Sequence, residues 1–132
     1  MRFVLSLFFV TTLLFAGYKD IDPKELQKLK DEGVVVIDIR TEPEWIDVGV
    51  IPGSQLATSH IDDGLVYDEF VKKLDEMGIY DDFILVCRSG NRSRELSERL
   101  NQDGYDGFYN LKNGIKSWIV QRKAVQKPML GY

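Results

Sequence analysis

The sequence of 132 residues contains only one cysteine and one histidine, and its formal net charge is −4. It has no basic stripe interleaved with aromatic side chains, so a nucleic-acid partner has little electrostatic support. A lone thiol cannot form a disulfide within the chain, nor can it build a cysteine-rich zinc or iron–sulfur site. Three roles are left for Cys87: a buried packing thiol, an intermolecular bridge or a reactive nucleophile.

The chain also lacks an apolar run long enough for a comfortable membrane span. Met1 and Arg2 form a short positive start, residues 3–15 are almost wholly apolar, and polarity returns at Tyr18. This pattern, with small residues at 16 and 17, predicts a secretory signal peptide over residues 1–17. A retained N-terminal anchor and a buried helix are the alternatives. We expect an exported, periplasmic protein with no integral membrane span after cleavage.

The remainder has a normal globular composition, with 44% hydrophobic and 29% charged residues in the chain. This length suits one domain and is too short for two ordinary ones. We expect a single domain over residues 18–122 and a loose C-terminal tail over residues 123–132.

Helical and strand patterns alternate along this domain. Asp22, Pro23 and Glu25 form the start signal of a helix, and we expect this helix to end at Gly33. Helical periodicity then marks residues 65–77, Ser93–Asp103 and the stretch around residues 115–119, and short apolar runs that predict strands cover residues 34–39, 83–86 and 108–109. This alternation predicts an α/β fold with a mainly parallel central sheet and helices on both faces.

Cys87 directly follows the apolar run 83–86, at the strand end where ligands bind in open α/β sheets. The next residues lead into a helix N-terminus, whose free N–H groups attract anions. Gly90 and Asn91 tolerate unusual backbone angles, so the loop can curl its amides around the sulfur. These amides, with Arg88 and Arg92, favour the nucleophilic thiolate. The competing interpretation is a small buried hydrophobe in a polar turn.

Three stretches resemble the rhodanese domain family, and the resemblance covers nearly all of the chain after the first 17 residues. They are Val36–Arg40 with Glu44-Trp45 and Gly49–Ser54, the loop Ile84–Ser93, and Gly104–Leu111 with Gly114 and Trp118. Two positions depart from the family pattern. Val50 stands where the family often has His, and Asn113-Gly114 where it often has Gly-Gly.

The resemblance implies that Cys87 is catalytic and carries a sulfane sulfur as a persulfide. It would receive this sulfur from a small anionic donor, thiosulfate or polysulfide, and pass it to a thiol or cyanide without a metal or cofactor. The residues expected to bind the substrate are Arg88, Ser89, Gly90, Asn91, Arg92 and Ser93. Arg88 and Arg92 could instead be solvated or hold a carboxylate.

Two other functions compete with this one. The first is a sulfur carrier that serves a partner oxidoreductase of sulfur metabolism. The second is a phosphatase or arsenate reductase of the same fold, which is disfavoured because only four residues separate Cys87 from Arg92. That spacing is one residue shorter than the Cys-to-Arg spacing of those relatives.

The remaining polar candidates are given structural roles. We expect Asp38 and Arg40 to brace the loop after their strand, and Glu95 and Arg99 to form a surface ion pair. His60 is expected to be solvated rather than to act as a base on Cys87. No nearby spacing supplies partners for a metal site, and both tryptophans are expected in the core.

Overall fold

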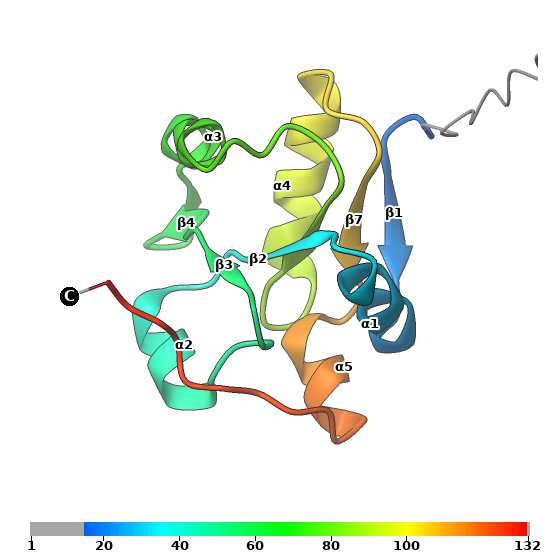
Figure 1. Cartoon of the computed structure of the whole chain (residues 1–132). Coiled ribbons are helices and arrows are strands. Elements are labelled where there is room, and N and C mark those ends of the chain that lie inside the picture. The colour runs from blue at the N-terminus through cyan, green and yellow to red at the C-terminus, as the bar shows by residue number, and fades with distance from the viewer. Residues whose placement is uncertain (1–14, 132) are drawn as a thin grey trace, which may run out of the picture.

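The computed structural model describes residues 15–131 (Figure 1). The expected signal peptide over residues 1–17 therefore lies almost entirely outside the described residues. Within residues 15–131, no helix is both long and apolar enough to cross a membrane.

A five-stranded parallel sheet forms the centre of the fold. Its strands are β1 (Tyr18–Ile21), β2 (Val35–Asp38), β3 (Gln55–Leu56), β6 (Phe83–Val86) and β7 (Phe108–Leu111). They are arranged in the order β1-β7-β6-β2-β3, and every neighbouring pair is parallel. All four residues of β6 are buried, because this middle strand is covered on both faces. The α/β fold class predicted from the sequence is confirmed.

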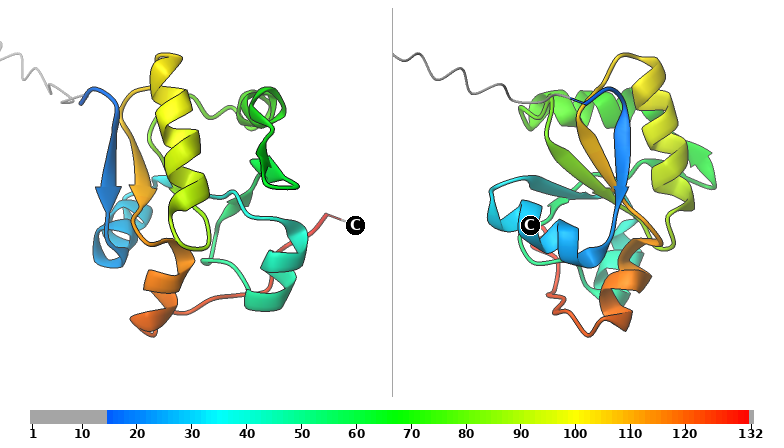
Figure 2. Two further views of the ribbon diagram at one scale, coloured as in Figure 1. Left: turned by 180° about the vertical axis from the view of Figure 1, so that it is seen from behind. Right: turned by 90° about the vertical axis from the view of Figure 1, so that its right-hand side faces the viewer.

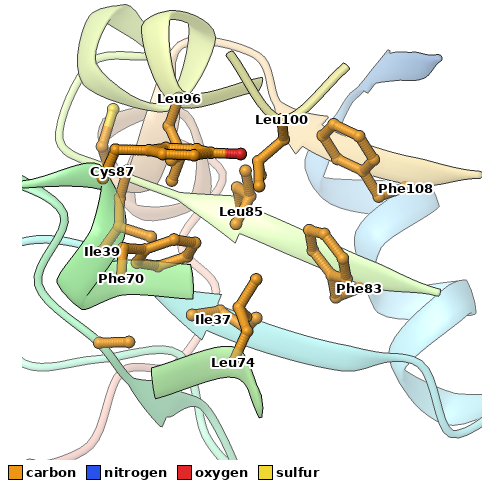
Figure 3. Packing of buried hydrophobic residues seen from close by; sticks show 12 residues of the cluster. Ile37, Ile39, Phe70, Leu74, Phe83, Leu85, Cys87, Leu96, Leu100 and Phe108 are labelled. Carbon is orange, nitrogen blue, oxygen red and sulfur yellow. The ribbon is translucent and has the colours of Figure 1, made fainter. Parts of the chain in front are cut away.

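Helices cover both faces of this sheet, as Figure 2 shows for α4 and α1. The helices are α1 (Pro23–Asp31), α2 (Glu42–Val48), α3 (Tyr67–Glu76), α4 (Asn91–Gln102) and α5 (Gly114–Val120), and a small hairpin pairs β4 (His60–Ile61) with β5 (Gly64–Leu65). Side chains of α3 and α4 pack in one cluster with Leu85 and Cys87 (Figure 3). Those of α1 and α5 pack in a second cluster with Ile84 and Val86. Successive β6 residues thus face opposite layers.

The first helix begins as its sequence predicts. Asp22 is the N-cap, and its Oδ1 accepts a hydrogen bond of 2.8 Å from the backbone N–H of Glu25. Pro23 stands in the first turn, where its missing N–H costs nothing. Gly33, just past the end, has a φ of +97°, which glycine adopts without strain.

Three local features differ from the sequence-based expectation. Helix α3 begins at Tyr67 rather than at residue 65, because Leu65 pairs with His60 in the hairpin. Helix α4 begins at Asn91, two residues before Ser93. The stretch after residue 122 is attached rather than loose at two points: Ala124 accepts a hydrogen bond from the Trp118 indole, and Gln126 pairs with Val50.

The predicted Glu95–Arg99 surface pair is wrong. Glu95 instead meets His60, with 2.9 Å between Oε2 and Nε2. The Arg99 guanidinium lies 4.3 Å from the centre of the Tyr67 ring and 3.9 Å from a carboxylate oxygen of Asp103. Glu95 thus has a tertiary partner in His60, and Arg99 contacts Tyr67 from another helix and Asp103 four residues further along the chain.

Candidate active site

Cys87 lies directly after β6, at the carboxyl end of the central strand, and it is 1% exposed. The backbone N–H of Gly90 donates to its sulfur at 3.1 Å, and that of Ser93 does so at 3.5 Å. The Ser93 hydroxyl lies 3.2 Å from the same sulfur. One side of the thiol touches the apolar cluster of Figure 3, which includes Ile39 and Leu96. The other side faces polar donors, so the sulfur does not lie wholly among apolar side chains.

Gly90 makes this arrangement possible. Its φ of +98° and ψ of −10° place it in the left-handed region, which glycine enters at no steric cost. The chain there turns sharply into α4, so the amides of the turn and of the first helical turn converge on one point. Converging amides of this kind form a site that favours negative charge.

The N-terminus of α5 is hydrogen-bonded to the backbone of the cysteine loop. The N–H of Ile115 donates to the Cys87 carbonyl at 2.8 Å, and that of Lys116 donates to the Arg88 carbonyl at 3.2 Å. Gly114 permits this approach, since a Cβ there would stand 2.5 Å from backbone atoms of Cys87 and Arg88. Asn113 has a φ of +63°, which asparagine tolerates better than most residues. Asn113 and Gly114 thus both have a positive φ, which two glycines would also adopt without strain.

Arg92, expected to bind substrate, is engaged by a carboxylate. Its two terminal nitrogens donate to Glu44 at 2.9 and 2.7 Å. The hydrogen bond from Arg92 is the largest cause that lowers the pKa of Glu44 to about 2, assisted by bonds from Thr41. Glu44 in turn raises the pKa of Arg92, with a smaller contribution from Cys87. The pair joins the first turn of α4 to α2. Arg92 thus holds a carboxylate, which was the alternative to substrate binding that its sequence allowed.

Asp38 and Arg40 form a buried cluster at the end of β2. Arg40, 1% exposed, donates from Nη2 to Asp38 Oδ2 at 2.7 Å and to the Gly49 carbonyl at 2.7 Å. The Trp45 indole N–H donates to Asp38 Oδ1 at 3.0 Å. These bonds connect the strand end with the middle of α2 through Trp45 and with Gly49 just past its end, which is a bracing position. That Asp38 and Arg40 support the loop for catalysis stays a prediction.

Val50 and His60 complete the surroundings. Val50 is buried, and its N–H and carbonyl both pair with Gln126. The expectation that His60 is solvated is wrong, because the side chain is 4% exposed. Its Nδ1 lies 2.7 Å from the Ser59 hydroxyl and its Nε2 2.9 Å from Glu95 Oε2. Its hydrogen bonds therefore join the β4–β5 hairpin to α4 rather than reach Cys87.

The exposed loop residues line two small cavities. Arg88 borders one of about 260 Å³ between α2 and α5. Ser89, Gly90 and Asn91 border another of about 140 Å³ on the side of β1 and β7. Of the six loop residues expected to bind substrate, Gly90 and Ser93 contact the sulfur and Arg92 is paired with Glu44. The other three, Arg88, Ser89 and Asn91, are exposed at the surface.

Glu44 is the residue of this site that sequence reasoning missed. It was noted only as part of a family signature. Its local signal is the Thr41-x-x-Glu44 spacing of a capping box, which the structure contains. Nothing in the sequence ties it to Arg92, which is 48 positions away.

Comparison with known proteins identifies relatives of the chain. The model of the rhodanese-like domain matches residues 22–121. The thiosulfate sulfurtransferase GlpE of Pseudomonas fluorescens strain Pf-5 is 32% identical over 101 residues, which cover 76% of this chain and 84% of that protein. A second GlpE, from Pseudomonas aeruginosa strain PAO1, has the same identity and coverage.

A solved structure has the same fold. The rhodanese-related protein of Thermoplasma volcanium superimposes with a TM-score of 0.62 at 25% identity, covering 84% of this chain and all of that one. The matched family model spans most of the chain and includes the whole cysteine loop. This protein therefore belongs to the rhodanese-like domain family.

Proposed function

We propose that this protein is a sulfurtransferase that takes a sulfane sulfur from thiosulfate or polysulfide onto Cys87 and passes it to a thiol or cyanide. The observation that carries the proposal is the pair of backbone N–H groups, from Gly90 and Ser93, that donate to the Cys87 sulfur at 3.1 and 3.5 Å. The relatives named thiosulfate sulfurtransferase support the same chemistry.

Two displacements make up the reaction. The Cys87 thiolate attacks the outer sulfur of thiosulfate, the sulfur–sulfur bond of the donor breaks, and sulfite leaves with the bonding electron pair. The outer sulfur is then bound to Cys87 as a persulfide, and the converging amides of the loop stabilise its negative charge. An acceptor nucleophile attacks that outer sulfur next, and Cys87 leaves as the thiolate.

The arrangement of Arg92 favours this function over phosphoryl chemistry. A phosphate-binding loop uses its arginine to hold equatorial oxygens in two hydrogen bonds. Here both terminal nitrogens of Arg92 already bind Glu44. A sulfur carrier that receives persulfide sulfur from a partner redox protein uses the same Cys87 environment, and it differs from the enzyme in turnover.

The discriminating experiment incubates the purified protein with thiosulfate and cyanide and measures thiocyanate. We expect sustained turnover that the Cys87→Ser variant abolishes. Slow turnover combined with ready labelling of Cys87 by polysulfide would support the carrier instead. Hydrolysis of aryl phosphates without thiocyanate formation would reject the sulfurtransferase.

We also propose that residues 1–17 direct export to the periplasm. The support is the positive start and the short apolar run of the sequence. Expression of the full chain in a Gram-negative host, followed by fractionation and intact mass, tests this. A periplasmic species shortened at residue 16 or 17 agrees with the proposal, a full-length membrane-bound species indicates an anchor, and a full-length cytoplasmic species contradicts export.

A further inference from the structure

Two partly buried charges of opposite sign lie next to the cysteine loop. The Arg92 guanidinium binds the Glu44 carboxylate through two hydrogen bonds of 2.9 and 2.7 Å, and the two side chains are 26% and 27% exposed. Arg92 directly precedes Ser93, whose backbone N–H donates to the Cys87 sulfur at 3.5 Å. Glu44 also borders the cavity lined by Arg88, the residue that follows Cys87. Both charges are therefore placed beside the residues that surround the sulfur.

The pair is fixed in position and stays ionised. Thr41 donates to Glu44 from its backbone N–H and from its hydroxyl, each at 2.9 Å, so the carboxylate is held within α2 as well as by Arg92. The pKa of Glu44 is about 2, and the side chain is therefore charged at neutral pH. Its hydrogen bond is the largest cause that raises the pKa of Arg92, and the charge of Cys87 adds to this rise. The guanidinium and the sulfur thus interact electrostatically.

An unpaired arginine beside Cys87 would attract anionic sulfur donors, and it would do so more strongly the more charge they carry. We propose that Glu44 is a specificity-determining residue for the sulfur donor: its carboxylate cancels the charge of Arg92 and so lowers the preference of Cys87 for doubly charged donors. Relative to a free arginine, this cancellation favours singly charged persulfides and polysulfides over the dianion thiosulfate. The inference rests on the proposed sulfurtransferase function and narrows its donor class.

Transfer from a singly charged donor needs no further reactant. The Cys87 thiolate attacks the outer sulfur of an alkyl persulfide anion, and a new sulfur–sulfur bond forms. The sulfur–sulfur bond of the donor breaks, and the donor keeps the electron pair and leaves as an alkyl thiolate. The total charge is the same before and after this step, and Cys87 carries the transferred sulfur as a persulfide anion.

Alkylation of Cys87, the only cysteine of the chain, measures the charge effect without depending on sulfur transfer. Iodoacetamide is neutral and iodoacetate carries one negative charge, and both react with the thiolate. The ratio of their rate constants, iodoacetate over iodoacetamide, cancels the thiolate fraction and the accessibility common to both reagents. The pair has no net charge in the wild type, one positive charge in Glu44→Gln, one negative charge in Arg92→Gln and none in the double variant.

We expect this ratio to rise about two- to fivefold in Glu44→Gln and to fall by a similar factor in Arg92→Gln, the range for partly exposed charges. The double variant and Glu44→Asp should both keep the wild-type ratio. Glu98→Gln is the matched control and should also keep it, since Glu98 is exposed further along α4 and forms no ion pair within residues 15–131. Equal ratios in all variants, or shifts in the same direction in both single variants, would overturn the proposal.

Sulfur donors extend the test to the function. Intact mass follows persulfide formation on Cys87 with thiosulfate, which has two charges, and with 2-hydroxyethyl persulfide, which has one when ionised. Glu44→Gln should raise the rate with thiosulfate relative to that with the persulfide about two- to fivefold, because the donors differ by one charge. Persulfide formation with an unchanged ratio would reject the inference alone. No persulfide from either donor, with alkylation ratios in the expected order, would reject the sulfurtransferase and its donor specificity while the charge effect on Cys87 stands.

Discussion

Replacing Gly114 by alanine should damage the active loop from a position that lies outside it. Gly114 has a φ of +61°, and a Cβ there would stand 2.5 Å from the Cys87 carbonyl oxygen and from the Arg88 carbonyl group. Left-handed backbone costs alanine about 1–2 kcal/mol. Relief of the clash requires α5 and the loop to separate, which breaks the two hydrogen bonds from Ile115 and Lys116. At about 1 kcal/mol each, these bring the total to about 3–4 kcal/mol.

The matched control is Gly78→Ala. Gly78 has a similar φ of +68° but nothing within 4 Å of its Cβ position, so only the backbone cost of about 1–2 kcal/mol applies. Thermal unfolding should show a drop of more than about 10 °C for Gly114→Ala and about half of that for the control. Thiocyanate formation should be lost only in Gly114→Ala. Equal melting temperatures and equal turnover in the two variants would refute the reasoning.

Two more predictions concern the groups around α2. Glu44 has a pKa of about 2 in the folded protein, below its unfolded value, so its charge stabilises the fold above about pH 4.5. That contribution, at most about 3 kcal/mol, is lost as the pH falls through 2. Urea unfolding should therefore show that the difference in free energy of unfolding between wild type and Glu44→Gln shrinks as the pH falls from about 4.5 to 2. A difference that stays constant would contradict the prediction. Trp45→Phe removes a donor to the Asp38 carboxylate and should cost about 1.5–3 kcal/mol. Trp118→Phe removes a donor to the neutral Ala124 carbonyl, so the loss of that hydrogen bond should cost less stability than in Trp45→Phe. Urea unfolding of the two variants measures both losses, and an equal or larger loss for Trp118→Phe would contradict the prediction.

Sequence patterns predicted the elements whose causes are local. The first helix follows from Asp22 and Pro23 at its start, and the buried strands β2 and β6 follow from uninterrupted apolar runs. The turn of amides around Cys87 follows from a strand end, a glycine and a helix start in succession. In each case the residues that decide the structure are neighbours in the chain.

The rest depends on contacts between distant segments. Strand β1 has two exposed polar residues in its centre and forms because β7 offers an edge to pair with. Strand β3 contains only two residues, and its pairing with β2 defines it. Helix α2 was not predicted, since its seven residues bury only Trp45. Such elements carry too little local pattern to be recognised.

Partners of charged side chains are hard to predict for the same reason. Glu95 could pair along its own helix with Arg99, yet the fold places His60 beside it, 35 positions away. Arg92 could face the substrate, yet Glu44 lies within reach of both its terminal nitrogens. Distance in three dimensions decides these contacts, and one sequence does not contain it.

The central claim is that Cys87 stores a sulfur atom under the amides of Gly90 and Ser93. Intact mass spectrometry after treatment with thiosulfate or polysulfide tests it directly. The account predicts a gain of one sulfur atom that disappears on addition of cyanide and never appears in Cys87→Ser. An unchanged mass of the wild-type protein under both donors would contradict it.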